Sequence, residues 1–336
     1  LYKNLFAMDF RTPVIIPEST FRIDHSTRIM LLGSCFSENM GAKLLEYKFR
    51  VNVNPFGIVY NPSSIAEVVK RLLSGRNFNE ADLVFHNGVY QSFLHHGRFS
   101  HPDKNKSLEN ISRSFDESAA CISGTDVFLI TFGTAYAYML KSTGEVVANC
   151  HKFPSDTFSR KRLTVETIVK EWNGIIDAIS ALNPAVKFIF TVSPIRHWKD
   201  GAHENQISKS ILHLAIDKLQ ESHATALSYF PAYEILLDEL RDYRFFAGDM
   251  MHPSSIATDY IWERFGETFF REKTQNANSE WSQLSRSLKH VPLNEQTENY
   301  RQFLKQTLQR LMLFRHNHPQ IDCLRETEEL TKKINQ

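Results

Sequence analysis

Short runs of almost uninterrupted apolar residues alternate with amphipathic stretches through most of this sequence. The apolar runs cover residues 28–32, 127–131, 186–192 and 226–229. Strands that are apolar on both sides belong to parallel sheets whose two faces are covered by helices. We therefore predict an α/β fold, a three-layer α/β/α domain with a parallel central sheet.

The intervening stretches have the periodicity of helices, and punctuation residues mark their ends. Asn61 and Pro62 form a favourable cap and first-turn pair. Two hairpins are predicted at 84–93, around Asn87-Gly88, and at 136–147. The predicted helices cover residues 38–47, 62–73, 164–182, 204–222 and 253–270.

The chain becomes polar after about residue 274 and is then helical and highly charged. We predict a catalytic domain at 8–275 and a helical C-terminal extension at 276–336. That extension is expected to pack on the domain or on a second copy of the chain, which would give a homo-oligomer. Residues 1–7 precede Met8 and are left out of the fold prediction.

Charge and cysteine content restrict the class of partner. The chain has 39 basic and 38 acidic residues, so we expect neither nucleic acid nor an anionic membrane as a partner. No apolar run reaches the roughly 20 residues of a membrane span. Four scattered cysteines indicate a reducing compartment, and we expect a cytoplasmic protein unless an export signal lies outside this sequence.

Ligands of open parallel sheets bind beyond the carboxyl ends of the strands. Ser34 directly follows the first predicted strand and precedes a helix, where backbone N–H groups favour an oxyanion. It is a candidate nucleophile, although serine at this position also serves as a plain helix cap.

A serine nucleophile needs an imidazole base whose second nitrogen is held by an acceptor. Asp249 and His252, in a loop before a predicted helix, have the spacing for that local hydrogen bond. By itself, this spacing more often marks a turn cap and a surface histidine; together with Gly33-Ser34-Cys35 after the first strand, it favours a catalytic pair. His197 is the rival base, with Asp200 as its nearest carboxylate.

The segment Gly33-Ser34-Cys35-Phe36-Ser37 resembles the signature of the GSCFA family, with Ser37 in place of alanine. That family is placed among the SGNH-type esterases and lipases, so the resemblance implies a flavodoxin-like SGNH-hydrolase fold. It extends over about residues 10–270. Further matching segments lie at 54–57, 132–135, 149–152 and 193–198.

The resemblance implies roles for individual residues. Ser34 would be the nucleophile and an oxyanion donor through its own N–H, His252 the general base and Asp249 its orienting acid. Gly57 matches the glycine of the second SGNH block, an oxyanion donor. The third block departs from the pattern: Gly133 and Thr134 are present, but the usual asparagine is not.

Loss of one oxyanion donor lowers the rate by about 10²–10³-fold. Thr134, Asn54 or a histidine could replace the missing amide. Arg196, His197 and Trp198 follow the third apolar strand and suit a polar ligand with a sugar-like face. With Asn54, Gly133 and His95, which is expected in a loop over the crevice, they are the predicted substrate-binding residues.

Other chemistries were weighed against the serine. Cys35 is the better intrinsic nucleophile, but its side chain should point away from Ser34 into the core. A structural role remains open for Arg196, Trp198 and His95. The histidines at 86, 95, 96 and 101 lack zinc-site spacing, so no metal and no organic cofactor is expected.

Together these features predict a serine esterase that forms an acyl-enzyme and hydrolyses short-chain O-acyl esters. The expected substrate is a small-molecule or carbohydrate ester, such as an O-acetylated sugar. The alternative is a catalytically degenerate protein of the same fold that binds a ligand or acts as a scaffold.

Overall fold

The central sheet of the computed structural model, which describes residues 11–294 and 296–335, has five parallel strands in the order β10-β9-β5-β1-β2. The four predicted strands are confirmed, and the edge strand β2 was not predicted because it carries polar residues and is only half-buried. The strands are β1 Arg28–Gly33, β2 Arg50–Val53, β5 Val127–Phe132, β9 Lys187–Val192 and β10 Leu227–Tyr229.

Numbered along the chain, these strands follow the order 2-1-3-4-5, which is the flavodoxin-like arrangement. The direction of strand addition reverses between β1 and β5. In such sheets the ligand crevice lies beyond the carboxyl ends of the two strands at the reversal. Ser34 and Gly133 directly follow these two strands.

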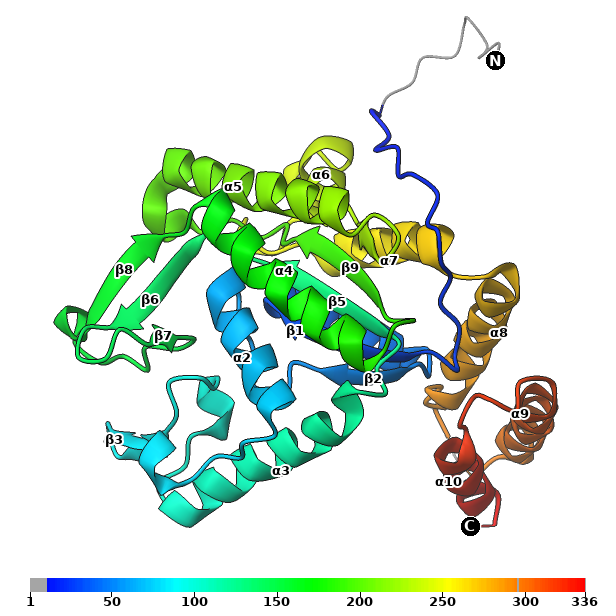
Figure 1. The fold of residues 1–336 in the computed structure, drawn as a ribbon. Coiled ribbons are helices and arrows are strands. Elements are labelled where there is room, and N and C mark those ends of the chain that lie inside the picture. Colours follow the sequence, from blue (N-terminus) through cyan, green and yellow to red (C-terminus); the bar gives the residue numbers. More distant parts are fainter. Residues whose placement is uncertain (1–10, 295, 336) are drawn as a thin grey trace, which may run out of the picture.

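Helices cover both faces of the sheet, so the predicted three layers are confirmed (Figure 1). On one face Phe132 and Phe190 contact Trp172, whose Nε1–H donates to Pro62 O at 3.2 Å. That face carries α2 Pro62–Ser74, α3 Lys104–Ile122, α4 Val165–Leu182 and α5 Gly201–Ser222. The other carries α1 Cys35–Glu46, α6 Ala232–Glu234 and α7 Ser255–Phe269.

Helix α7 begins two residues later than predicted. Pro253 forms an isolated bridge with Phe246, and Ser254 caps the helix by accepting from Ala257 N. The bridge holds the residues before the helix in an extended conformation, so the helix starts only after it.

Two small antiparallel elements extend from the domain, as predicted. Asn87 and Gly88 join β3 Val84–His86 to β4 Val89–Gln91, and both have positive φ, as the tight turn of such a hairpin requires. A second element pairs β6 Tyr136–Leu140 with β7 Val146–Val147 and, unexpectedly, with β8 Phe158–Arg162. Short helical turns lie at Glu80–Asp82, Gly97–Phe99, Ser155–Thr157, Trp198–Asp200, Ile235–Glu239 and Tyr243–Phe245.

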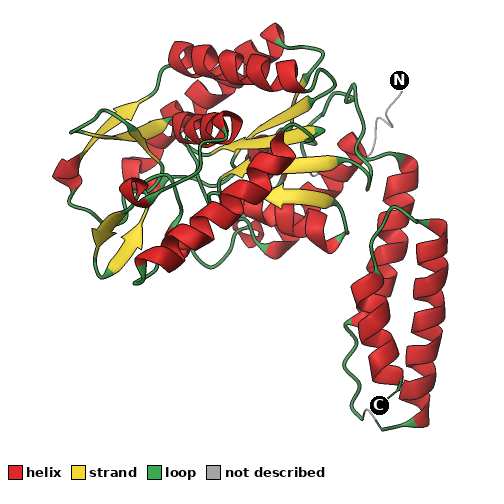
Figure 2. Cartoon of the chain, turned by 60° about the horizontal axis from the view of Figure 1, so that its bottom comes forward, coloured by secondary structure: helices red, strands yellow, loops and turns green. Residues whose placement is uncertain are grey.

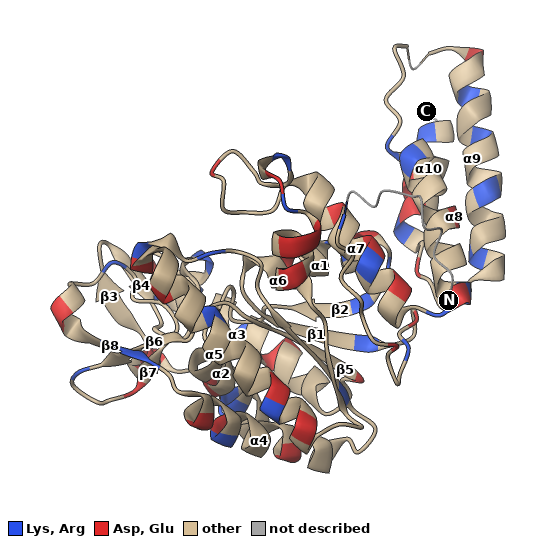
Figure 3. Ribbon diagram, turned by 90° about the horizontal axis from the view of Figure 1, so that it is seen from above, with Lys and Arg blue, Asp and Glu red and all other residues tan. Residues whose placement is uncertain are grey.

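Three helices follow the sheet domain: α8 Glu272–Leu288, α9 Glu298–Asn317 and α10 Leu324–Ile334. They surround their own apolar cluster and stand beside the sheet domain (Figure 2). Trp281 of α8 donates to Glu46 O at 2.7 Å, which ties them to the end of α1. Basic residues recur along α9, which has one acidic residue at its start, whereas α10 carries both basic and acidic residues (Figure 3). No helix in the described ranges is long and apolar enough to cross a bilayer.

Candidate functional site

Ser34 lies between the end of β1 and the first turn of α1. Its Oγ accepts a hydrogen bond from Phe36 N at 3.2 Å, and the residue is 3% exposed. The predicted capping role is therefore real. The same geometry holds Ser34 at the positive end of α1, where a developing negative charge is stabilised.

Ser34 is held in place by close packing around Gly33 and by the hydrogen bond between Gly33 and Asn54. Gly33 has φ +146°, and a Cβ there would lie 2.4 Å from Thr131 O, so only glycine fits. Its N–H donates to Asn54 Oδ1 at 2.9 Å. Asn54 is fully buried at φ +45°, a left-handed conformation that asparagine tolerates. Arg98 Nη2 donates to Asn54 O at 2.6 Å and helps to fix it there.

The predicted oxyanion donors differ in availability. Gly57 N already donates to Asn54 O at 2.7 Å. Thr134 N donates to Tyr60 O, while the Thr134 hydroxyl lies 3.1 Å from Ser208 Oγ and accepts from Tyr136 N. Asn54 Nδ2, by contrast, is a buried donor without a hydrogen-bond partner in the described chain. Of the residues considered as replacements for the absent third-block amide, Asn54 therefore has a side-chain donor that is not already used by the described residues.

Asp249 and His252 form the local pair that their spacing predicts. His252 Nδ1 lies 2.5 Å from Asp249 Oδ2, and Asp249 Oδ1 accepts from the N–H groups of Met251 and His252, each at 3.0 Å. These backbone donors, with the imidazole, lower the pKa of Asp249 to about 2. The ionised carboxylate can accept a proton carried on Nδ1, and in that tautomer of the imidazole Nε2 is the proton acceptor.

Helices α1 and α7 bring Ser34 and this pair to the same end of the domain. Lys43 pairs with Asp259 at 2.5 Å, and one turn further along both helices Tyr47 stacks on Trp262 with ring centroids 5.2 Å apart. The helices therefore run in the same direction, and their starts lie at the same sheet edge. Among the described residues no hydrogen bond joins Ser34 to His252, and the capping bond uses Ser34 Oγ only as an acceptor.

The predicted substrate-binding residues after β9 divide into two groups. His197 packs 5.4 Å from the Tyr60 ring, and its Nε2 faces Gly133. Burial and the charges of Lys209 and Arg160 lower its pKa to about 4, so His197 is neutral at physiological pH. Arg196 and Trp198 instead line a cavity of about 210 Å³, which Met250 of the Asp249–His252 loop also lines.

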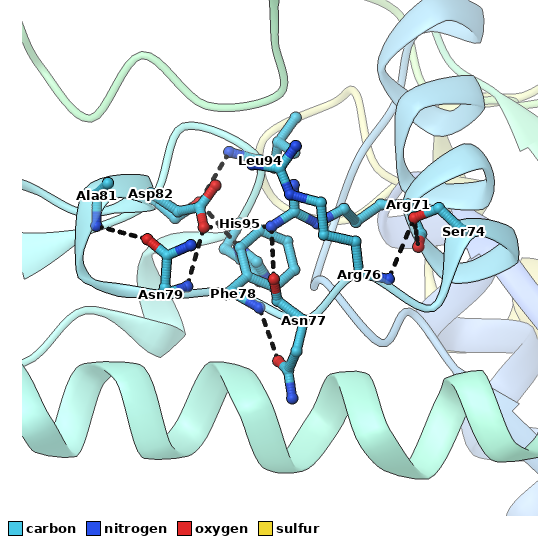
Figure 4. Close-up of polar contacts among 11 residues, drawn as sticks. Arg71, Ser74, Arg76, Asn77, Phe78, Asn79, Ala81, Asp82, Leu94 and His95 are labelled. Atoms are coloured by element: carbon cyan, nitrogen blue, oxygen red, sulfur yellow. Dashed lines mark hydrogen bonds and ion pairs between the residues drawn. The ribbon is translucent and has the colours of Figure 1, made fainter.

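His95 does not reach an accessible surface. It is 1% exposed, stacks on Phe56 at 4.4 Å and meets Phe78 edge-on at 4.7 Å. Burial lowers its pKa to about 3. Figure 4 shows it beside the loop that Arg71 fixes through Asn77 O and Asp82. The structure thus gives His95 a packing role, which was the alternative left open.

Lys209 is a residue at this edge that the sequence reasoning missed. It is fully buried, and its Nζ donates to Gly133 O and Ser193 O, each at 2.7 Å. Burial lowers its pKa to about 7. It shares the buried face of α5 with Leu212 and Ile216, and a lysine on an apolar helical face is the signal that could have revealed it.

The alternative chemistries find less support in this geometry. Cys35 is half-buried against the core, and burial raises the pKa of its thiol, which disfavours the thiolate. Within the described ranges, no cluster of three or more histidine, cysteine, aspartate or glutamate side chains is arranged to hold a metal ion.

Comparisons with known proteins were made for the whole chain. The GSCFA family matches residues 28–265, and the C-terminal domain of GSCFA domain proteins matches residues 281–336. No curated protein matches the sequence.

Two solved structures share a low overall similarity with the chain. A carbohydrate esterase family 3 protein from Talaromyces cellulolyticus has 11% identity and a TM-score of 0.34, over 72% of this chain and 95% of that one. The acetyl xylan esterase Est2A from Butyrivibrio proteoclasticus has 11% identity and a TM-score of 0.32, over 72% of this chain and 63% of that one. At these scores the likeness carries no argument about activity.

Proposed function

The chain belongs to the GSCFA family, and we propose that it is a serine esterase that hydrolyses short-chain O-acyl esters. The observation that carries the proposal is the Asp249–His252 pair at the sheet edge where Ser34 caps α1. O-acetyl groups on a carbohydrate are the favoured substrates.

The proposed reaction has two steps. Ser34 Oγ rotates out of its capping bond and attacks the ester carbonyl, while His252 Nε2 takes the hydroxyl proton. The carbonyl oxygen becomes an oxyanion facing Ser34 N–H and Asn54 Nδ2, and the leaving alcohol takes the proton from His252. Water then gives a proton to His252 and attacks the acyl-enzyme, which releases the acid and restores Ser34.

A fluorophosphonate probe tests the nucleophile. We expect covalent labelling of the native chain and none of Ser34→Ala. Two variants serve as matched controls for Ser34→Ala. Cys35→Ala removes the neighbouring thiol. Ser37→Ala removes a buried hydroxyl in the same turn, which donates to Thr131 Oγ1 at 2.7 Å. Both should label. Labelling of Ser34→Ala, or no labelling of the native chain, refutes the proposal.

A second candidate function is ligand binding without catalysis. Two observations favour it: among the described residues the Ser34 hydroxyl caps α1 and makes no hydrogen bond to His252, and Gly57 N–H is occupied by Asn54 O. This candidate predicts that the native chain binds an acetylated sugar but neither reacts with the probe nor releases acetate. Acetate release that depends on Ser34 and His252 excludes it.

A further inference from the structure

The cavity beside the Asp249–His252 loop is lined by apolar side chains and by Arg196, a cation that has no ion pair among the described residues. Leu236, Leu237 and Phe246 supply apolar surface, and Met250, which lies between Asp249 and His252 in sequence, forms part of the wall. Arg196 and Trp198 enter it from the segment after β9. Because one wall belongs to the loop that carries the proposed base, a group in this cavity lies next to the reacting ester.

Arg196 has no carboxylate to balance its charge. No ion pair within the described residues includes it, and its buried Nε–H has no hydrogen-bond acceptor there. The other charged residues of the cavity are matched, since Arg241 pairs with Asp238 at 3.5 Å and Asp242 with Arg244 at 2.8 Å. A partly buried guanidinium without a counter-charge is unfavourable unless an anion completes its hydrogen bonds.

The positive charge of Arg196 affects the pKa values of two neighbouring groups. Arg196 hydrogen-bonds Tyr233, whose pKa is raised mainly by burial but held down by this cation. It also contributes, after burial, to the lowered pKa of Lys209. Positive potential therefore extends from the cavity to the sheet edge, and it favours an anionic ligand over a neutral one.

We propose that this cavity binds a carboxylate carried by the substrate, with Arg196 as the anion-binding residue and Trp198 as the surface against which the adjoining ring lies. The planar guanidinium matches a carboxylate through two parallel hydrogen bonds. Trp198 is 46% exposed and offers a flat apolar face at the cavity mouth. The volume equals that of about seven water molecules, which suits a single small ring with one carboxylate.

This inference rests on the proposed esterase activity, and it specifies the substrate as an acidic ester. The carboxylate can come from either side of the ester bond. On the alcohol side it would belong to a sugar acid or a hydroxy acid, and on the acyl side to a dicarboxylic monoester. The chemistry that Arg196 recognises is the same in both cases.

Three small esters separate these cases: neutral phenyl acetate, 4-acetoxybenzoate with its carboxylate on the alcohol, and monophenyl succinate with its carboxylate on the acyl group. We expect kcat/KM for one acidic ester to exceed that of phenyl acetate by about tenfold or more. In Arg196→Gln that ratio should fall to about one. In Arg241→Gln, which removes an exposed, paired arginine of the same cavity, the ratio should change by less than about threefold.

Binding of 4-hydroxybenzoate, measured by calorimetry against phenol, gives a readout that does not depend on catalysis. The native chain should bind it more tightly than phenol, R196Q should lose that preference, and R196K should lie between them, because lysine keeps the charge without the planar fork. Equal binding in all three overturns the inference, as does a ratio near one for both acidic esters in the native chain. Arg196-dependent binding without hydrolysis of any ester would refute only the proposed activity.

Discussion

Asn54 Oδ1 accepts the Gly33 N–H at 2.9 Å, which ties the residue before Ser34 to a loop twenty-one positions later. The Nδ2 of the same side chain is buried and has no hydrogen-bond acceptor among the described residues. The oxygen thus fixes the backbone next to Ser34, the proposed nucleophile, while the nitrogen has no partner among the described residues. This arrangement makes Asn54 the most informative residue of the proposed oxyanion site.

Replacing Asn54 by glycine should reduce esterase turnover with little backbone strain, since glycine accepts φ +45° readily. We expect kcat to fall by about 10²–10³-fold because an oxyanion donor is lost. The unfolding free energy should fall by about 1–3 kcal/mol because Gly33 N–H is left unpaired. Ester hydrolysis and urea unfolding measure the two effects. A kcat within about threefold of the native value would remove Asn54 from the oxyanion site.

The variant Asp249→Asn should keep the loop but disable the base. The amide oxygen can still accept from Met251 and His252, while the amide N–H₂ facing His252 Nδ1 shifts the imidazole proton to Nε2. Turnover should then fall by about 10³–10⁴-fold, as expected for a base in the wrong tautomer. Steady-state kinetics test this, and unchanged fluorophosphonate labelling rates in the variant would contradict it.

The pKa of Asp249 also predicts how acid affects the loop. Because the pKa in the folded state, about 2, lies below the reference value of 3.8, its hydrogen bonds stabilise the native state above about pH 4. That contribution is lost as the pH falls through about 2. The difference in melting temperature between the native chain and the Asp249→Asn variant should therefore shrink across this window, and a difference independent of pH would argue against it.

Gly57 should be intolerant of a side chain for a packing reason. It has φ +79°, and a Cβ would lie 2.2 Å from His96 Cβ. Gly144 is the matched control, because its φ is +77° but nothing lies within 4 Å of its Cβ position. Gly144→Ala should destabilise by about 1–2 kcal/mol from backbone conformation alone. Gly57→Ala should lower the free energy of unfolding by about 1–3 kcal/mol more than Gly144→Ala does, because its methyl group overpacks the site. Chemical unfolding measures both losses. Equal losses would contradict the contact with His96.

Lys209 makes stability depend on pH above neutrality. Its folded pKa of about 7 lies below the ordinary lysine value of 10.5, so between these values the unfolded chain binds more protons. Stability should then rise with pH from about 7 toward 10.5, and the burial penalty should be fully present below about 7. Lys209→Met should lack this rise. Melting temperatures of both proteins from pH 6 to 10 test it, and parallel curves would refute it.

Features that depend on residues close together in the sequence could be predicted without knowledge of the fold. The strand from residue 127 is apolar at every position except Thr131 because both of its faces are buried, and that pattern is visible in the chain itself. The Asp249–His252 pair spans three residues and closes within its own loop. The Asn87-Gly88 turn follows from the backbone freedom of those two residues.

Features governed by distant contacts were not accessible. His95 looks like any loop histidine until Phe56, Phe78 and Phe99 close around it. Strand β2 has no apolar pattern of its own and is defined by its ladder to β1. The free amide of Asn54 becomes significant only where its other atom meets Gly33.

Sequence order alone was enough to infer the layered fold, the cap at Ser34 and the pairing of Asp249 with His252. Short-range hydrogen bonds and the periodicity of burial are properties of adjacent residues, so they can be inferred from order along the chain. The packing of α1 beside α7, where Lys43 pairs with Asp259, could be seen only in three dimensions. This packing brings the starts of both helices to one edge of the sheet. Such alignment depends on how two apolar helix faces pack on a shared sheet, which no local pattern specifies.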